Sequence, residues 1–247
     1  MYSEPISCSK ENPYSQACDN HVIQRTFRTC VGISYWSALK TAVPKYILRT
    51  LHQDRADTTT GDDETCHYDM KDQFGHPMLA YAASKSMALD ATKDFMKAQQ
   101  PSFDLVELMP AFVFGPNPLA RTPEEFIHGS NSVLLNHLLG NEGTGLMSAS
   151  VHIDDVAKCH VQSLDRSISA GRYLLASDTT NWEEVIPVVK KYFPQAVGTT
   201  FVDDAEVKEL KIVCDNEKAE KTFGLKFKSF EEQVKSAVGY YLGLVSK

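Results

Sequence analysis

Tyr81 and Lys85 are the two residues whose types and spacing point most directly to chemistry. They lie at the start of a run, 80–98, that is rich in helix formers, and on a helix residues four apart project from the same face. An ammonium group beside a phenol favours the phenolate, so such a tyrosine can give or take a proton near neutral pH. For the pair alone, an ordinary helix with a half-buried tyrosine and a solvated lysine is the commoner explanation.

The helix that would carry this pair is predicted to be amphipathic. Its apolar or small side chains recur at helical spacing, at Met87, Ala88, Ala91, Phe95 and Ala98. A strand-like run over 103–108 follows the helix. Three further segments come later in a fixed order: MPAFVFGP at 109–116, VHIDDVA at 151–157, and VCDNEKA at 213–219 followed by FGL at 223–225.

In this order and spacing, the YxxxK helix and these segments resemble the extended short-chain dehydrogenase/reductase family. The most similar branch is that of the dihydroflavonol-reductase-like ketoreductases and the NAD(P)-dependent epimerase/dehydratases. The resemblance covers roughly 29–242. Four motifs that agree in order are much more specific than any one of them.

The resemblance implies an NADP(H)-dependent ketoreductase that acts on a small carbonyl or a secondary alcohol. In that reaction Tyr81 protonates the carbonyl oxygen, and Lys85 assists Tyr81 and holds the nicotinamide ribose. The family strand before the helix ends in a serine that binds the substrate carbonyl, and here Thr50 is the hydroxyl nearest that place. The residues implied to flank the nicotinamide ring are Pro110, Phe112 and Val113.

The fold class expected from the resemblance is α/β, a partial Rossmann-like parallel sheet with a small C-terminal substrate lobe. We expect a poorly ordered tail at 1–27, a remnant of the dinucleotide-binding domain at 28–116, and the lobe at 117–247, with 151–176 returning to the sheet. Hydrophobic periodicity predicts the following elements: helices at 29–39, 80–98, 119–140, 154–164, 181–193 and 230–244, strands at 45–48, 103–108, 151–153 and 172–176, and a long loop at 54–77. Either Asp154 or Asp155 is expected to cap the helix that follows 151–153.

A glycine-rich turn between a first strand and helix normally receives the dinucleotide pyrophosphate. No glycine precedes Thr29, and the glycines at 140–145 are predicted to form a surface loop without that strand and helix context. By resemblance, the N-terminal strands of the sheet are missing. A second hypothesis therefore stands beside the ketoreductase: a truncated, non-catalytic paralogue or gene-model fragment that binds no cofactor alone.

Composition excludes several other classes of function. The 247 residues carry a net charge of −7, which argues against nucleic acid as a partner. We find neither a signal-peptide pattern nor an apolar run that predicts a membrane span, and we expect a cytoplasmic protein. The six scattered cysteines and the histidines at 52, 67 and 76 have no metal-ligand spacing, so no metal site is predicted.

One interaction with another chain is expected. If the strands that normally flank 45–48 are missing, the backbone groups of that strand are left unpaired at a sheet edge. Unpaired edges and newly exposed apolar faces promote association. The sequence therefore predicts that the isolated chain either forms a homodimer through this exposed sheet edge or aggregates.

Overall fold

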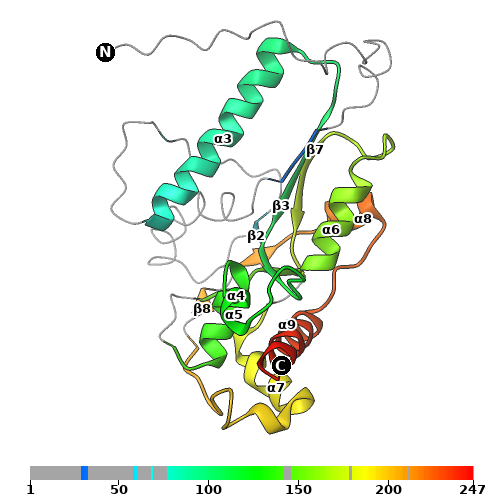
Figure 1. Cartoon of the computed structure of the whole chain (residues 1–247). Helices are drawn as coiled ribbons and strands as arrows, with labels where there is room; N and C mark the ends of the chain where they lie inside the picture. Colours follow the sequence, from blue (N-terminus) through cyan, green and yellow to red (C-terminus); the bar gives the residue numbers. More distant parts are fainter. Residues whose placement is uncertain are drawn as a thin grey trace, which may run out of the picture.

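The centre of the protein is a sheet of three parallel strands, seen in a computed structural model that describes residues 29–32, 58–59, 68, 77–141, 146–177, 180–207, 209–210 and 212–246. Its order is β1 (Thr29–Gly32), β3 (Leu105–Pro110), β7 (Gly171–Leu175) (Figure 1). Thr29 pairs with Leu105, and the β3–β7 register runs from Val106 opposite Gly171 to Pro110 opposite Leu175. All pairs are parallel, which confirms the expected α/β fold class with a Rossmann-like partial sheet.

Strand β3 continues almost without a break into β4 (Phe112–Phe114) and changes its partner on the way. The Ala111 N–H still donates to the Leu175 carbonyl of β7, at 3.0 Å. One residue later the Phe112 N–H donates to the Ala149 carbonyl at 3.2 Å, and β4 then pairs in parallel with β6 (Ser150–His152). One run of chain therefore joins the sheet to the C-terminal lobe.

Two further parallel pairs are short. Strand β2 (Thr58–Thr59) pairs with β9 (Val213–Cys214), and β5 (Leu146–Met147) pairs with β8 (Glu209–Leu210).

Helices cover the sheet on two sides: Figure 1 shows α3 (Pro77–Gln99) on one side, and α6 (Ile153–Gln162) and α8 (Glu217–Phe223) on the other.

The hydrophobic core falls into two clusters. The sheet cluster lies under α6 and α8, and includes Val106 and Leu108 of β3 with Cys159 and Phe223 of the two helices. The lobe cluster is larger and forms where α9 (Phe230–Val245) packs against α4 (Pro123–Phe126), α5 (Ser130–Leu138) and α7 (Val185–Tyr192). At about 1.5–3 kcal/mol for each fully buried large apolar side chain, these clusters provide the main stabilisation of the two regions.

Local sequence signals set where several helices of the lobe begin and end. The Asn181 side chain accepts from the Glu183 N–H and begins η1 (Trp182–Glu184), which runs directly into α7. Pro194 ends that helix and begins η2 (Pro194–Ala196). Ser229 and Glu232 form a complete capping box at the start of α9.

An ion pair joins neighbouring strands on the face of the sheet opposite the sheet cluster. Glu107 Oε2 lies 3.4 Å from Arg172 Nε, and the two residues are direct register partners in β3 and β7. Burial raises the pKa of the Glu107 carboxyl, and the positive charges of Arg172 and of Lys93 on α3 oppose that rise. The charge of Lys93 acts on Glu107 from α3, which places that helix over this face.

Most predicted elements are confirmed, with shifted ends. The strands at 103–108, 151–153 and 172–176 correspond to β3, β6 and β7, and the helices at 80–98 and 230–244 to α3 and α9. The helix expected over 119–140 is two helices, α4 and α5, separated by Gly129, whose φ of 59° lies in the left-handed region that favours glycine.

The predicted apolar face of α3 is wrong. Ala88, Ala91 and Ala98 are exposed, and Phe95 is 50% exposed, whereas the buried side chains are Ala82, Ala83, Ser86 and Leu89. These four residues also follow helical spacing. Two of them are alanines and one is a serine, so a hydrophobicity pattern weights them lightly although small side chains allow close packing.

The helix expected over 29–39 is also wrong at its start, because Thr29–Gly32 forms strand β1. Thr and Val are β-branched and fit a strand well, and parallel pairing with β3 outweighs the weak helical periodicity. Within the expected loop at 54–77, Thr58–Thr59 forms β2. The strand at 45–48, the tail at 1–27 and the glycines at 143 and 145 lie outside the described residues. None of the described helices is long and apolar enough to cross a membrane.

Candidate functional site

Tyr81 and Lys85 lie one turn apart in the first turns of α3. Lys85 Nζ is 5.6 Å from the centroid of the Tyr81 ring, so the two side chains share a face as the spacing predicts. Both are half-buried, which leaves each of them partly accessible to a ligand. The predicted proximity of the two side chains is therefore present, and their catalytic roles stay predictions.

The sequence places this pair by simple local rules. Pro77 opens α3, where the missing proline N–H costs nothing, and no glycine or proline interrupts the helix afterwards. The helix ends at Gln99, and the next residue, Gln100, has a φ of 44° and a bond from its N–H to the Met96 carbonyl that resemble a left-handed cap. The chain then turns back, so the end of β3 at Pro110 lies toward the end of α3 that carries Tyr81 (Figure 1).

The segment expected to flank the nicotinamide ring starts at that end of β3. Pro110 is buried as the last residue of the strand. In β4, Phe112 packs in the lobe cluster and stacks on Phe114 with 6.0 Å between ring centroids. Val113 points the other way and is only half-buried against the sheet cluster. Of these side chains, Val113 retains the most surface for a ligand.

Gly115 fixes the turn that follows β4. Its φ is 138°, and a Cβ at this position would lie 2.6 Å from Cγ2 of Ile153. The Asn131 side chain holds the same backbone, accepting from the Gly115 N–H at 3.3 Å and donating to the Gly115 carbonyl at 3.0 Å. A glycine is required here because the chain passes too close to α6 for a side chain.

A second polar cluster was not predicted from the sequence. His152, rather than Asp154 or Asp155, caps α6: its Nδ1 accepts from the Asp154 N–H at 3.1 Å. The Asp154 carboxylate pairs with the ammonium group of Lys228. The Asp155 carboxylate accepts from the Lys228 N–H at 2.8 Å and so joins α6 to the segment before α9. The expected aspartate cap is therefore wrong because both carboxylates bind Lys228.

The position of the His152 proton follows from these contacts. Since Nδ1 accepts from a backbone N–H, the proton of the neutral ring is on Nε2, which then donates to Ser236 Oγ at 2.8 Å. Ser236 Oγ in turn donates to the Gln233 carbonyl at 3.1 Å. His152 thus donates a hydrogen bond to Ser236 and does not accept the hydroxyl proton of that serine. The arrangement of Ser236, His152 and Asp154 is therefore not a nucleophilic triad.

Burial lowers the pKa of His152, and the charge of Lys228 lowers it further. Asp154, Asp155 and Glu232 act in the opposite direction, with smaller effects. The imidazole is 3% exposed, which agrees with a ring that stays neutral at physiological pH.

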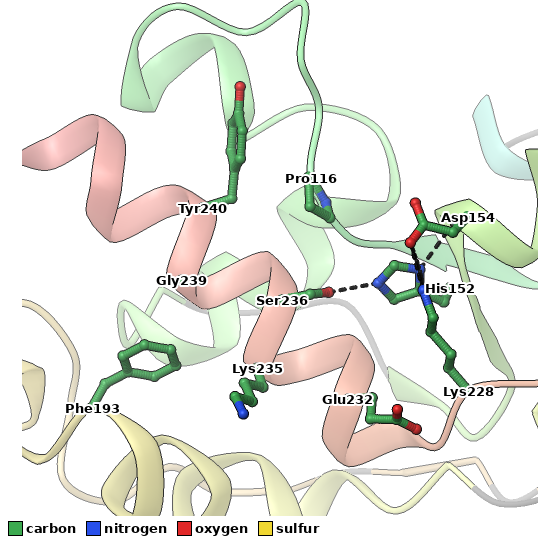
Figure 2. A pocket seen from close by; sticks show the side chains of 10 residues that line it. All are labelled: Pro116, His152, Asp154, Phe193, Lys228, Glu232, Lys235, Ser236, Gly239 and Tyr240. Atoms are coloured by element: carbon green, nitrogen blue, oxygen red, sulfur yellow. Dashed lines mark hydrogen bonds and ion pairs between the residues drawn. The ribbon is translucent and has the colours of Figure 1, made fainter.

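An open pocket of about 580 Å³ lies along α9 beside this cluster. Figure 2 shows α9 crossing the pocket, with Ser236 directed at His152 and Phe193 on the opposite side of the helix. We call it the α9 pocket. It is lined by Pro116, His152, Asp154, Phe193, Lys228, Glu232, Lys235, Ser236, Gly239 and Tyr240.

Among the described residues, no group of three or more His, Cys, Asp or Glu side chains could hold a metal ion. Of the residues predicted to act in the reaction, the structure brings together Tyr81 and Lys85. Thr50 lies outside the described residues. The roles of Pro110, Phe112 and Val113 stay predictions.

A parallel sheet flanked by helices, with a Tyr-x-x-x-Lys helix before its central strand, defines a Rossmann-like α/β protein of the extended short-chain dehydrogenase/reductase type. Residues 37–197 match the NAD-dependent epimerase/dehydratase family, and the chain belongs to it. It is 33% identical to ketoreductase CTB6 of Cercospora nicotianae over 188 residues, which cover 72% of this chain and 53% of that protein.

Ketoreductase sphI of Aspergillus fumigatus is 35% identical over 178 residues, covering 69% of this chain and 51% of the relative. The fold matches that of yeast methylglyoxal/isovaleraldehyde reductase Gre2 complexed with NADPH. That match has a TM-score of 0.66 and 18% identity, and covers 92% of this chain and 68% of the other. The chain spans about half the length of the curated relatives that it matches.

The buried histidine predicts how stability depends on pH. His152 has a lowered pKa in the folded state, and so has His137, whose shift is due to burial. Below the ordinary value of 6.5 the unfolded chain binds protons that the folded chain does not. The free energy of unfolding is therefore fully retained above about pH 7 and falls as the pH drops below 6.5.

Urea unfolding at pH 7.5 and pH 5.5 measures this loss, and the lowered carboxyl pKa values of Asp154 and Glu232 keep both groups charged across that window. His152→Gln should be less stable than the parent at pH 7.5 and lose less stability on acidification. His128→Gln, at an exposed position, should keep the parent's pH dependence. Equal losses of the free energy of unfolding in the parent and in His152→Gln between pH 7.5 and pH 5.5 would contradict the neutral role of His152.

Proposed function

We propose that this chain carries the catalytic pair of an NADP(H)-dependent ketoreductase that acts on a small carbonyl or a secondary alcohol. The observation that supports this best is the Tyr81–Lys85 pair at the start of α3, in a chain of the epimerase/dehydratase family. Lys85 Nζ lies 5.6 Å from the centroid of the Tyr81 ring. Relatives named ketoreductases and a fold neighbour complexed with NADPH favour the same reaction and cofactor.

In this proposal the Tyr81 phenol protonates the carbonyl oxygen of the substrate. The Lys85 ammonium group stabilises the phenolate that remains and holds the nicotinamide ribose. Bound NADPH supplies the hydride. Val113 and Pro110 border the ring, and Thr50 takes the place of the family serine at the carbonyl oxygen. Residues 28–116 would then belong to the dinucleotide-binding domain and 117–247 to the substrate lobe, with 151–176 in the sheet.

The second candidate is a truncated, non-catalytic paralogue or gene-model fragment that binds no cofactor alone. It is supported by the coverage of the relatives, about half of their length, and by the absence of a glycine-rich phosphate turn from the printed sequence. The two candidates differ in the coding region upstream of Met1. A strand followed in frame by GxxGxxG would support the complete enzyme.

Replacing Tyr81 tests the catalytic assignment. In a preparation with reductase activity, Tyr81→Phe should lower kcat by about 10²–10⁴-fold, because general acid catalysis typically contributes that much. The fold should be kept, since only a hydroxyl group is removed. Lys85→Met should lower kcat and also raise the KM for NADPH, because the charge serves both the tyrosine and the ribose.

Tyr192→Phe is the matched control, because it removes the same group from a tyrosine that bonds to Glu231 in the lobe. It should keep the parent's turnover. Wild-type turnover in Tyr81→Phe, measured by NADPH oxidation, would rule out the assignment of Tyr81.

Cofactor affinity tests how much of the dinucleotide site this chain contains. The residues proposed here reach only the nicotinamide end. Loss of two or three charge-assisted hydrogen bonds to the phosphates, at about 1.5–3 kcal/mol each, weakens binding by orders of magnitude, because about 1.4 kcal/mol is tenfold.

We therefore expect this chain alone to bind NADPH with a Kd no lower than about 1 mM in calorimetric titration. A micromolar Kd would show that another part of the chain binds the phosphates.

The predicted homodimer through an exposed sheet edge is kept as a proposal, together with the cytoplasmic location. The strand that prompted it, at 45–48, lies outside the described residues. We expect a concentration-dependent dimer mass in light scattering of the purified chain. A monomer at all concentrations would remove this proposal.

A further inference from the structure

The α9 pocket contains none of the residues assigned to the reductase reaction. It is formed by one face of α9, by Phe193 between α7 and η2, and by Pro116 after β4 (Figure 2). Tyr81 and Lys85 are on α3, and Val113 precedes the turn at Gly115. Its chemistry can therefore be considered independently of the proposed active site.

The middle of the pocket is shaped for a flat apolar group. Gly239 and Ser236 have no side chain or a small one on the α9 face that runs through it. A Cβ at Gly239 would lie 3.3 Å from Cζ of Phe193, so the edge of that ring packs against the glycine and forms one side of the pocket. Tyr240 and Pro116 line the pocket on the other side of the helix (Figure 2). Aromatic rings pack well against such surfaces.

The charged side chains around this space differ in whether another group of the protein already binds them. The Asp154 carboxylate pairs with Lys228. The Glu232 carboxylate accepts from the Ser229 N–H and Oγ, both at 2.9 Å, and these bonds lower its pKa. Both carboxylates lie at the end of the pocket near His152, and each is already bound by another group of the protein.

Lys235 is the cation at the other end. Its Nζ lies 4.3 Å from the centroid of the Tyr192 ring, and both Lys235 and Phe193 line the pocket. Among the ion pairs of the described residues, none joins Lys235 to a carboxylate, and the nearby Glu231 is bonded by Lys191 and Tyr192. Its three N–H donors can therefore bind a ligand.

We propose that the α9 pocket binds a planar aromatic molecule that carries one carboxylate. The ring lies along the α9 face with Phe193 on one side and Tyr240 on the other, and the carboxylate accepts hydrogen bonds from Lys235 Nζ. The orientation follows from charge, because Glu232 and Asp154 would repel a carboxylate at the opposite end. Such a site would let an aromatic acid bind to the lobe without entering the reductase site.

Binding of 2-naphthoate to the purified chain, followed by calorimetry, tests the proposal, with 2-naphthalenemethanol as the uncharged analogue. We expect naphthoate to saturate a single site and to bind about tenfold more tightly than the alcohol, as one charge-assisted hydrogen bond supplies. Lys235→Gln should remove that advantage and leave the alcohol unaffected. Lys190→Gln, an exposed lysine of α7 paired with Asp203, is the control for net charge and should bind like the parent.

Gly239→Val should weaken both probes at least about tenfold by displacing the Phe193 ring that packs against Gly239, and Gly239→Ala replaces it if the valine variant does not fold by circular dichroism. Tyr81→Phe should bind naphthoate like the parent, which separates this site from the reductase site. The proposal is overturned if naphthoate does not saturate a site below about 10 mM, if Lys235→Gln leaves its advantage intact, or if Tyr81→Phe abolishes binding.

Discussion

The structure depends on the continuous run from β3 into β4. Its first part is held in the sheet by β7, and its second part is held by β6 in the lobe, with the partner changing between Ala111 and Phe112. Because the backbone groups of both parts are bonded, the sheet and the lobe share one rigid segment. The side chains of that segment then belong alternately to the two hydrophobic clusters, Phe112 to one and Val113 to the other.

This constraint also places the two polar sites. The return of the chain after α3 brings the end of β3 toward the turns of α3 that carry Tyr81. Beyond β4, Gly115 allows the chain to approach Ile153, the first residue of α6, closely. His152, the last residue of β6, lies at the same junction between β6 and α6. The proposed reductase site and the α9 pocket are therefore positioned by a single run of chain, the first near the end of β3 and the second beyond the end of β4.

Local signals predicted well what depends on local geometry. The YxxxK spacing predicted the contact between Tyr81 and Lys85, and apolar periodicity predicted the helical segment over 181–193, which the Asn181 side chain caps. Non-local pairing was harder. Strand β1 depends on β3, 76 residues away between Thr29 and Leu105, and His152 caps α6 only because Lys228 occupies both neighbouring aspartates. A hydrophobicity pattern contains no information about such partners, and it also underweights the small side chains that face the core from α3.

The distinction between local and non-local contacts also separates the proposed catalytic pair from the complete proposed reaction. The contact between Tyr81 and Lys85 needs only one helical turn, so it forms wherever α3 forms. Binding of a dinucleotide needs groups brought together from several strands, including N–H groups at a helix N-terminus for the phosphates. A YxxxK helix can therefore supply the acid–base pair that we propose, while the hydride part of the proposed reaction depends on contacts that one helix cannot supply. Family membership links the two parts, and measurement of cofactor affinity on this chain separates them.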